Sequence, residues 1–167
     1  FNRRVLRFPA DSKKADVVLG QSDFFSASAE GCQNNAPLNK MCTPTLAKLN
    51  PETGELYVID ERPFGFKARI LVFRPPFVSG MSAYTSIVPN QNKDGFINWK
   101  EDYGDTSPMF DKNGNYEFQT TGFEFNPIKE GRYKNGIIWV NEHKTQRTLL
   151  LDNDGNVIEV LNTPDEN

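Results

Sequence analysis

The sequence repeats itself, and this constrains the fold more than any other feature. Two phrases of strand-forming residues stand at residues 49–60 and 69–73. Looser copies of both phrases return later in the chain, at residues 125–127, 136–141 and 147–151. At the start, RVLRF at residues 4–8 matches RILVF at residues 69–73, without the phrase that should precede it. Repeats of this kind are small sheets that cannot bury their own faces, so neighbouring units must stack on one another.

Composition and charge narrow the class of protein. The 167 residues include 13 Phe, 12 Gly and 11 Pro, which favours an all-β, turn-rich chain over a helical bundle. The net charge of −3 gives no electrostatic reason to expect nucleic acid, which needs a concentrated basic face. The densest group of basic residues borders a predicted strand and is interpreted as a solvated face: Arg3, Arg4, Arg7, Lys13 and Lys14. No run of about 18 apolar residues is present, so no segment is expected to span a membrane.

Alternation of apolar and polar residues predicts short strands separated by turns. These strands are expected at residues 4–8, 16–21, 45–50, 55–60, 68–73, 82–88, 122–126, 136–141, 147–151 and 157–161. Four such strands joined in sequence by hairpins make one blade of a β-propeller. We therefore predict a partial first blade with a cysteine loop, a second blade, an irregular insertion, a third blade and a tail, at residues 1–44, 45–88, 89–121, 122–161 and 162–167.

The start of the chain indicates that more repeats precede it. The sequence begins with Phe1 rather than Met, and its first repeat lacks the front half. We therefore expect an incomplete propeller fragment, whose natural reading frame extends into further blades. No secretory signal is visible, and a truncated start would remove one.

The two cysteines, Cys32 and Cys42, enclose a polar loop of nine residues. This spacing can close a small disulfide, which would suit an oxidising compartment. A pair of buried free thiols is the alternative. A metal site is disfavoured because no second cysteine pair and no neighbouring histidine completes a set of ligands.

Several phrases together resemble a known repeat family. They are NRRVLRF at residues 2–8, ADVVLGQSDF at residues 15–24, GELYVID at residues 54–60 and RILVFRPPF at residues 69–77. These phrases resemble the NHL repeats of bacterial secreted β-propeller proteins. The likeness is close over residues 1–81 and holds in outline over residues 122–160.

The resemblance implies a blade architecture without a catalytic residue set, since most members of the family are binding or scaffolding modules. In that family the loop after the Leu-Gly-Gln strand often holds two cysteines ahead of a proline, as Cys32, Cys42 and Pro44 do here. This likeness favours the disulfide. The sequence departs from the family before Arg69, where the usual Asn-Asn-Arg is missing, and at residues 88–91, where VPNQ replaces the second Leu-Gly-Gln.

The sharpest local match to a metal site is a calcium loop at residues 90–101, which fits the spacing of an EF-hand. Its oxygen ligands, at loop positions 1, 3, 5 and 12, would be Asn90, Asn92, Asp94 and Glu101. Only two of these ligands carry charge, and Pro89 stands where an entering helix should be. A polar hairpin turn is the alternative, and calcium is the one cofactor that the pattern admits.

Four polar residues are the predicted ligand-binding positions. If residues 46–50 and 122–126 form the innermost strands of two blades, alternation directs one set of side chains toward the propeller axis. This set is Lys48, Asn50, Glu124 and Asn126. The alternative is a structural role, because packing between blades also uses polar residues at the edge of the channel.

Aromatic residues near predicted loops indicate a second binding surface, because aromatic anchors often carry interface energy. They are Phe24, Phe25, Phe64, Phe66, Phe77, Tyr84 and Trp99. Burial in the core is the alternative for most of them. The single histidine, His143, is interpreted as an exposed turn residue rather than a catalytic base.

The sequence therefore predicts a non-enzymatic binding or scaffolding module that presents loops to a protein or carbohydrate partner. We expect it to act in the extracellular space or the periplasm, joined to further propeller blades, and we assign no catalytic residue. The alternative is part of a six-bladed propeller hydrolase or lyase with a metal-containing axial site. Carboxylates and amides converging on the axis around a bound calcium would favour the enzyme.

Overall fold

Strands make up nearly all of the regular structure. The computed structural model describes residues 2–29, 32, 37–61, 68–89, 120–142 and 147–161. Apart from one short 3-10 turn, η1 (Gly131–Tyr133), every element within these residues is a β-strand. The predicted all-β class is therefore confirmed. The chain divides into two compact units, Phe1–Ser86 and Ile87–Asn167, and the finer division into five parts stays a prediction.

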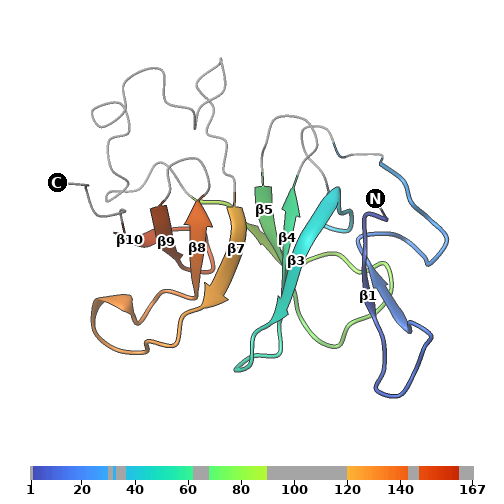
Figure 1. Cartoon of the computed structure of the whole chain (residues 1–167), viewed down its shortest axis with the longest axis horizontal. Helices are drawn as coiled ribbons and strands as arrows, with labels where there is room; N and C mark the ends of the chain where they lie inside the picture. Colours follow the sequence, from blue (N-terminus) through green and yellow to red (C-terminus); the bar gives the residue numbers. More distant parts are fainter. Residues whose placement is uncertain are drawn as a thin grey trace, which may run out of the picture. The chain divides into compact units, whose positions relative to one another are not determined.

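The N-terminal part of the chain holds a strand pair and a larger sheet. The pair consists of β1 (Val5–Arg7) and β2 (Val17–Leu19), which run antiparallel. The larger sheet has the order β3-β4-β5-β6, so strands that follow one another in the chain are also neighbours in the sheet. Figure 1 shows β3, β4 and β5 of this sheet. Its strands are β3 (Thr43–Leu49), β4 (Leu56–Glu61), β5 (Ala68–Phe73) and β6 (Thr85–Ile87).

The C-terminal part repeats this arrangement. Its four strands also form an antiparallel sheet in chain order, β7-β8-β9-β10 (Figure 1). They are β7 (Thr120–Phe125), β8 (Ile138–Glu142), β9 (Arg147–Leu151) and β10 (Val157–Leu161). The strands predicted at residues 68–73, 147–151 and 157–161 have the predicted bounds. Most of the predicted insertion at 89–121 lies outside the described residues, and β7 begins within its last residues.

Burial along the strands follows their place in the sheet. β5 is apolar except for Arg69 and is buried at all six positions, as expected of a strand with a neighbour on each side. β3 is an edge strand and alternates between exposed and half-buried positions. Its proline, Pro44, sits beside an irregularity in the pairing with β4, which is where a residue without an N–H is tolerated in a sheet.

Apolar side chains from both sheets of the first unit form one core. Its buried members are Val17, Leu19, Met41, Val58, Leu71, Phe73 and Ala83. The loop between β5 and β6 also binds β2 through its backbone. Gly80 donates to the Val18 carbonyl at 3.0 Å, and the Val18 N–H donates to the Ser79 hydroxyl at 3.1 Å. The strand pair is therefore fixed to the larger sheet by packing and by hydrogen bonds.

Gly20 lets the chain turn tightly as it leaves β2. Its φ of +86° lies in the left-handed region, and a Cβ placed there would lie 2.5 Å from Cγ of Met41. Met41 is fully buried, and its N–H donates to the Gly20 carbonyl at 3.2 Å. Both the backbone conformation and the close contact with Met41 therefore require glycine.

We expect Gly20→Ala to destabilise the first unit more than Gly54→Ala does. Gly54 also has a positive φ, of +71°, but its added Cβ would meet only Pro75 at 3.9 Å. The conformational cost of about 1 kcal/mol applies to both variants, and overpacking against Met41 adds roughly 1–3 kcal/mol at Gly20 alone. Urea denaturation followed by circular dichroism measures both. Equal losses of unfolding free energy in the two variants would show that the Met41 side chain can move aside at no cost in stability.

Candidate functional site

The cysteine loop is closed by a disulfide between Cys32 and Cys42. Their Cα atoms lie 5.4 Å apart, and both residues are buried. The disulfide that the sequence favoured is therefore confirmed. It joins the loop that follows β2 to the residue just before β3, so the closed loop is anchored at the edge of the larger sheet.

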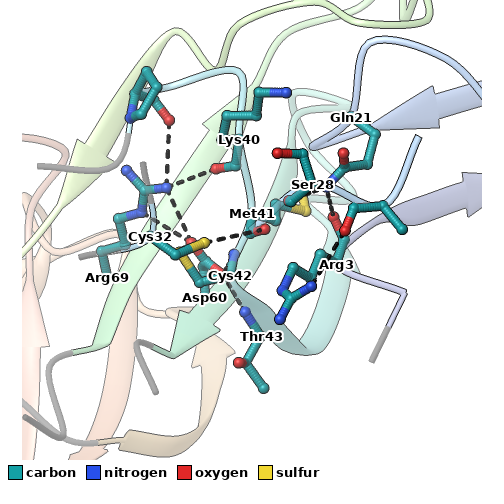
Figure 2. The surroundings of a disulfide bond; sticks show 12 residues. Arg3, Gln21, Ser28, Cys32, Lys40, Met41, Cys42, Thr43, Asp60 and Arg69 are labelled. Atoms are coloured by element: carbon teal, nitrogen blue, oxygen red, sulfur yellow. Dashed lines mark hydrogen bonds and ion pairs between the residues drawn. A yellow bond between two sulfur atoms is a disulfide. The ribbon is translucent and has the colours of Figure 1, made fainter. Parts of the chain in front are cut away.

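A buried ion pair lies beside this disulfide, as Figure 2 shows. Asp60 stands near the end of β4 and Arg69 near the start of β5, and the two residues face each other in the register of these strands. The Arg69 guanidinium lies 3.0 Å from Oδ2 of Asp60, and both side chains are almost completely excluded from water. A desolvated pair of this kind is stable only when further hydrogen bonds satisfy both groups.

Those further bonds go to the backbone of the cysteine loop. Oδ1 of Asp60 accepts the N–H groups of Cys42 at 2.7 Å and Thr43 at 2.9 Å. Arg69 donates to the Lys40 carbonyl at 2.7 Å and to the Pro37 carbonyl at 3.4 Å (Figure 2). Because both carboxylate oxygens and the guanidinium are used in this way, the pair fixes the loop rather than presenting a free acid or base.

The second unit carries the same pair of residue types at the same place. Glu142 ends β8 and Arg147 begins β9, and the register puts them opposite each other. Both residues are buried, with 2% and 3% of their surface exposed. In both four-stranded sheets, therefore, an acidic residue near the end of the second strand faces an arginine near the start of the third strand. Sequence reasoning noted the repeated arginines but not the acids that face them.

The structure places two of the predicted ligand-binding residues in turns. Asn50 is buried after β3, and its side-chain oxygen accepts the Glu52 N–H at 2.9 Å. Asn126 is buried after β7, and its amide donates to three backbone carbonyls, those of Ile128, Tyr133 and Gly136. These bonds explain why asparagine stands at both positions, and a binding role for them stays a prediction.

The other two predicted residues lie on edge strands. Lys48 is half-buried on β3, where it faces Tyr57 of β4 in the register. Glu124 is exposed on β7, where it faces Trp139 of β8. Lys48 and Asn50 belong to the first unit, and Glu124 and Asn126 belong to the second. Their joint role at one site stays a prediction.

The predicted calcium ligands Asn90, Asn92, Asp94 and Glu101 lie outside the described residues, as does His143. Within the described ranges, no group of three or more His, Cys, Asp or Glu side chains is placed to hold a metal ion. The acidic turn at residues 152–156 joins β9 and β10 in a hairpin. Oδ1 of Asp152 accepts the N–H groups of Asp154 and Asn156, at 2.9 and 2.8 Å, so this carboxylate holds the turn.

An exposed aromatic residue projects from the loop that follows β2. Phe25 has 96% of its surface exposed, and its neighbour Phe24 has 38%. The loop is held by Asp23, whose Oδ1 accepts the N–H groups of Phe25 at 2.8 Å and Ser26 at 2.7 Å. Oδ2 accepts the Ser26 hydroxyl at 2.8 Å. These hydrogen bonds, led by the one from the Ser26 hydroxyl, lower the pKa of Asp23 to about 2.

A second exposed aromatic residue, Tyr84, stacks against Arg74. The guanidinium carbon of Arg74 lies 3.3 Å from the centre of the Tyr84 ring, and Arg74 also donates to Glu55 at 2.8 Å.

Tyr57 and the remaining predicted aromatic residues are buried, half-buried or outside the described residues. Burial, followed by the nearby Glu55 carboxylate, raises the pKa of Tyr57 to about 12, so this phenol stays neutral. Phe77 is half-buried against the core, while Phe64, Phe66 and Trp99 lie outside the described residues.

Comparison with protein-family models, with curated proteins and with solved structures finds no match to this chain. In the described part of the chain, no helix has the length and apolar character needed to cross a bilayer.

We expect Asp60→Asn to destabilise the first unit by about 3–5 kcal/mol, because it leaves Arg69 charged and buried without its counter-ion. The exposed pair of Arg7 and Asp16, joined at 2.6 Å, is the matched control. There Asp16→Asn should change the stability much less, because water and salt already screen an exposed pair. Urea denaturation measures the free energy of unfolding, and hydrogen exchange of the Cys42 and Thr43 amides reports loss of the loop contacts. Similar small losses in both variants would contradict the anchoring role of Asp60.

Proposed function

We propose that the chain is a non-enzymatic binding or scaffolding module of an NHL-like β-propeller, which presents loops to a protein or carbohydrate partner. The observation that carries this proposal is Phe25, an almost fully exposed aromatic side chain on a loop that Asp23 holds in place. A partner that covers so large an apolar group would remove its surface from water, which favours binding. A fixed loop also loses little conformational entropy when it binds.

The propeller part of the proposal is supported by the repeated sheet. Both four-stranded sheets run in chain order, as the strands of a propeller blade do. Both carry a buried acid opposite a buried arginine between their second and third strands. The strand pair β1–β2 begins with the same sequence phrase as β5, so it matches the third and fourth strands of a further blade.

An extracellular or periplasmic location is part of the same proposal. The Cys32–Cys42 disulfide is compatible with it, because disulfides persist in oxidising compartments.

The binding role predicts that Phe25→Ala lowers affinity for the partner about tenfold or more, because aromatic anchors dominate binding energy. The probes are soluble oligosaccharides of cellulose, xylan and chitin, together with random peptides displayed on phage. Binding is measured by isothermal calorimetry with each retained probe. The matched control is Val78→Ala, which truncates another exposed apolar side chain in a different loop. Absence of saturable binding to every probe, or equal affinity of Phe25→Ala and wild type, would contradict the proposal.

The order of the loop should depend on pH through Asp23. Because folding lowers the pKa of this carboxyl from its ordinary value near 3.9 to about 2, its hydrogen bonds are fully present above about pH 4 and disappear as the pH falls through 2. A carbon-detected NMR titration of the Asp23 carboxyl, read together with the Phe25 amide shift, measures this. In Asp23→Asn the Phe25 amide shift should not change over this range. Titration of Asp23 near pH 3.9 would show that the loop bonds do not form in solution.

A further inference from the structure

The segment that leads to Cys42 is held in place by hydrogen bonds that do not involve the disulfide. Oδ1 of Asp60 accepts the N–H of Cys42 itself at 2.7 Å, and Arg69 donates to the Lys40 carbonyl at 2.7 Å. The side chains of Asp60 and Arg69 are almost completely buried, so water does not compete for these bonds. The Cys42 half of the loop is therefore fixed by β4 and β5.

Two further contacts hold the same segment. The Met41 N–H donates to the Gly20 carbonyl at 3.2 Å, and the Met41 side chain is fully buried. The Leu38 carbonyl accepts the Ala83 N–H at 2.8 Å, and the Leu38 side chain packs against the core. All of these partners belong to the first unit. We call residues 37–43, together with the partners that hold them, the Cys42 seat.

The segment that leads to Cys32 is held by a buried glutamine. Gln21 is completely buried, and its amide nitrogen donates to the Ser28 carbonyl at 3.3 Å (Figure 2). Four residues after Ser28 in the sequence, the Cys32 N–H donates to the Ala29 carbonyl at 3.1 Å. Gly20 and Gln21 are neighbours in the chain, so one short segment contacts both the Cys42 seat and the residues before Cys32.

These contacts determine how readily the two sulfur atoms meet. Sγ of Cys32 lies 3.8 Å from the Met41 carbonyl oxygen, which belongs to the Cys42 seat. The tendency of two thiols in one chain to form a disulfide depends on the effective concentration of one thiol at the other. Segments that hydrogen bonds already fix lose little conformational freedom when the disulfide closes. The Cys42 seat therefore raises this effective concentration.

We propose that Asp60, Arg69 and Gln21 are positioning residues for the disulfide between Cys32 and Cys42. The Cys42 seat forms without the disulfide, holds Cys42 where Cys32 can reach it, and so favours the oxidised form. The disulfide in turn stabilises the seat, because the coupling between two equilibria is reciprocal. This proposal is independent of the binding role proposed for the loop that carries Phe25.

The disulfide forms by two thiol–disulfide exchanges with a small disulfide such as oxidised glutathione. In the first exchange, the thiolate of one cysteine attacks a sulfur of the small disulfide, and one glutathione leaves as its thiolate. In the second exchange, the thiolate of the other cysteine attacks the protein sulfur of this mixed disulfide, and the second glutathione leaves. The two cysteines are oxidised and lose two protons, while oxidised glutathione is reduced and its two thiolates take up those protons.

Hydrogen exchange of the unaltered chain tests whether the Cys42 seat forms without the disulfide. The reduced form is prepared by refolding the chain in dithiothreitol, and the oxidised form is the reference. The amides of Cys42 and Thr43, which donate to Asp60, should exchange within about tenfold of their rates in the oxidised form, because their hydrogen bonds remain. Loss of this protection in the reduced form would overturn the proposal, because the disulfide would then create the seat.

The thiol–disulfide equilibrium in glutathione buffers measures the effect of each positioning residue. Gln21→Met removes the two hydrogen bonds that the Gln21 amide donates. Little else is lost, because Oε1 of Gln21 makes no hydrogen bond within the described part of the chain. Asp60→Ala removes the acceptor of the Cys42 and Thr43 N–H groups. Each variant should lower the effective concentration of the thiols about tenfold or more, because the lost bonds favour the closed loop.

Two control variants separate positioning from a general loss of stability. Asp16→Asn removes one charge of an exposed ion pair, and Phe73→Leu removes core packing at the opposite end of β5 from Arg69. Both should keep the wild-type effective concentration of the thiols.

The outcomes are decisive even if Asp60→Ala does not fold, because Gln21→Met and the reduced wild-type chain test the same seat. An effective concentration in Gln21→Met equal to that of the wild type would overturn the proposal. An equally large loss in Phe73→Leu would also overturn it, because destabilisation of the first unit would then explain the effect.

Discussion

The buried pair of Asp60 and Arg69 holds the first unit together at the point where three segments meet. The two residues lie on neighbouring strands, β4 and β5, and their remaining polar atoms bind the backbone of the cysteine loop. Removing either charge would leave the other buried without a counter-ion, which costs far more than loss of an exposed ion pair. The disulfide between Cys32 and Cys42 closes the same loop covalently. The loop is therefore held both by this bond and by the hydrogen bonds from Arg69 to its carbonyl groups.

The same arrangement in the second unit indicates that it belongs to the repeat rather than to one local contact. Glu142 and Arg147 occupy the equivalent register position, although the loops around them differ in length and sequence. A buried ion pair is a weak source of net stability, but it penalises every register that separates the two charges. We infer that the Asp60–Arg69 pair fixes how β4 and β5 align, and the register puts Glu142 and Arg147 at the equivalent position of β8 and β9.

Exposed apolar groups, rather than the buried charged residues, indicate where the chain could bind a partner. The charged residues between the strands are buried, whereas the loop after β2 exposes Phe25 to water. Asp23 holds this loop in place through local hydrogen bonds.

The sequence by itself predicted the all-β class and most of the strands and favoured the disulfide, whereas the tertiary structure decided what the polar residues do. Short runs that are almost entirely apolar, such as residues 68–73 with Arg69 as the one exception, favour a buried strand, because such a run must be hidden from water. The disulfide followed from two cysteines in one polar loop and from the family resemblance. The roles of Asn50 and Asp60 could not be predicted in this way, because alternation shows which side a residue faces but not which atoms it meets. Asn50 bonds to its own turn, and Asp60 finds Arg69 only through the register of two strands, so distances across the sheet decided both roles.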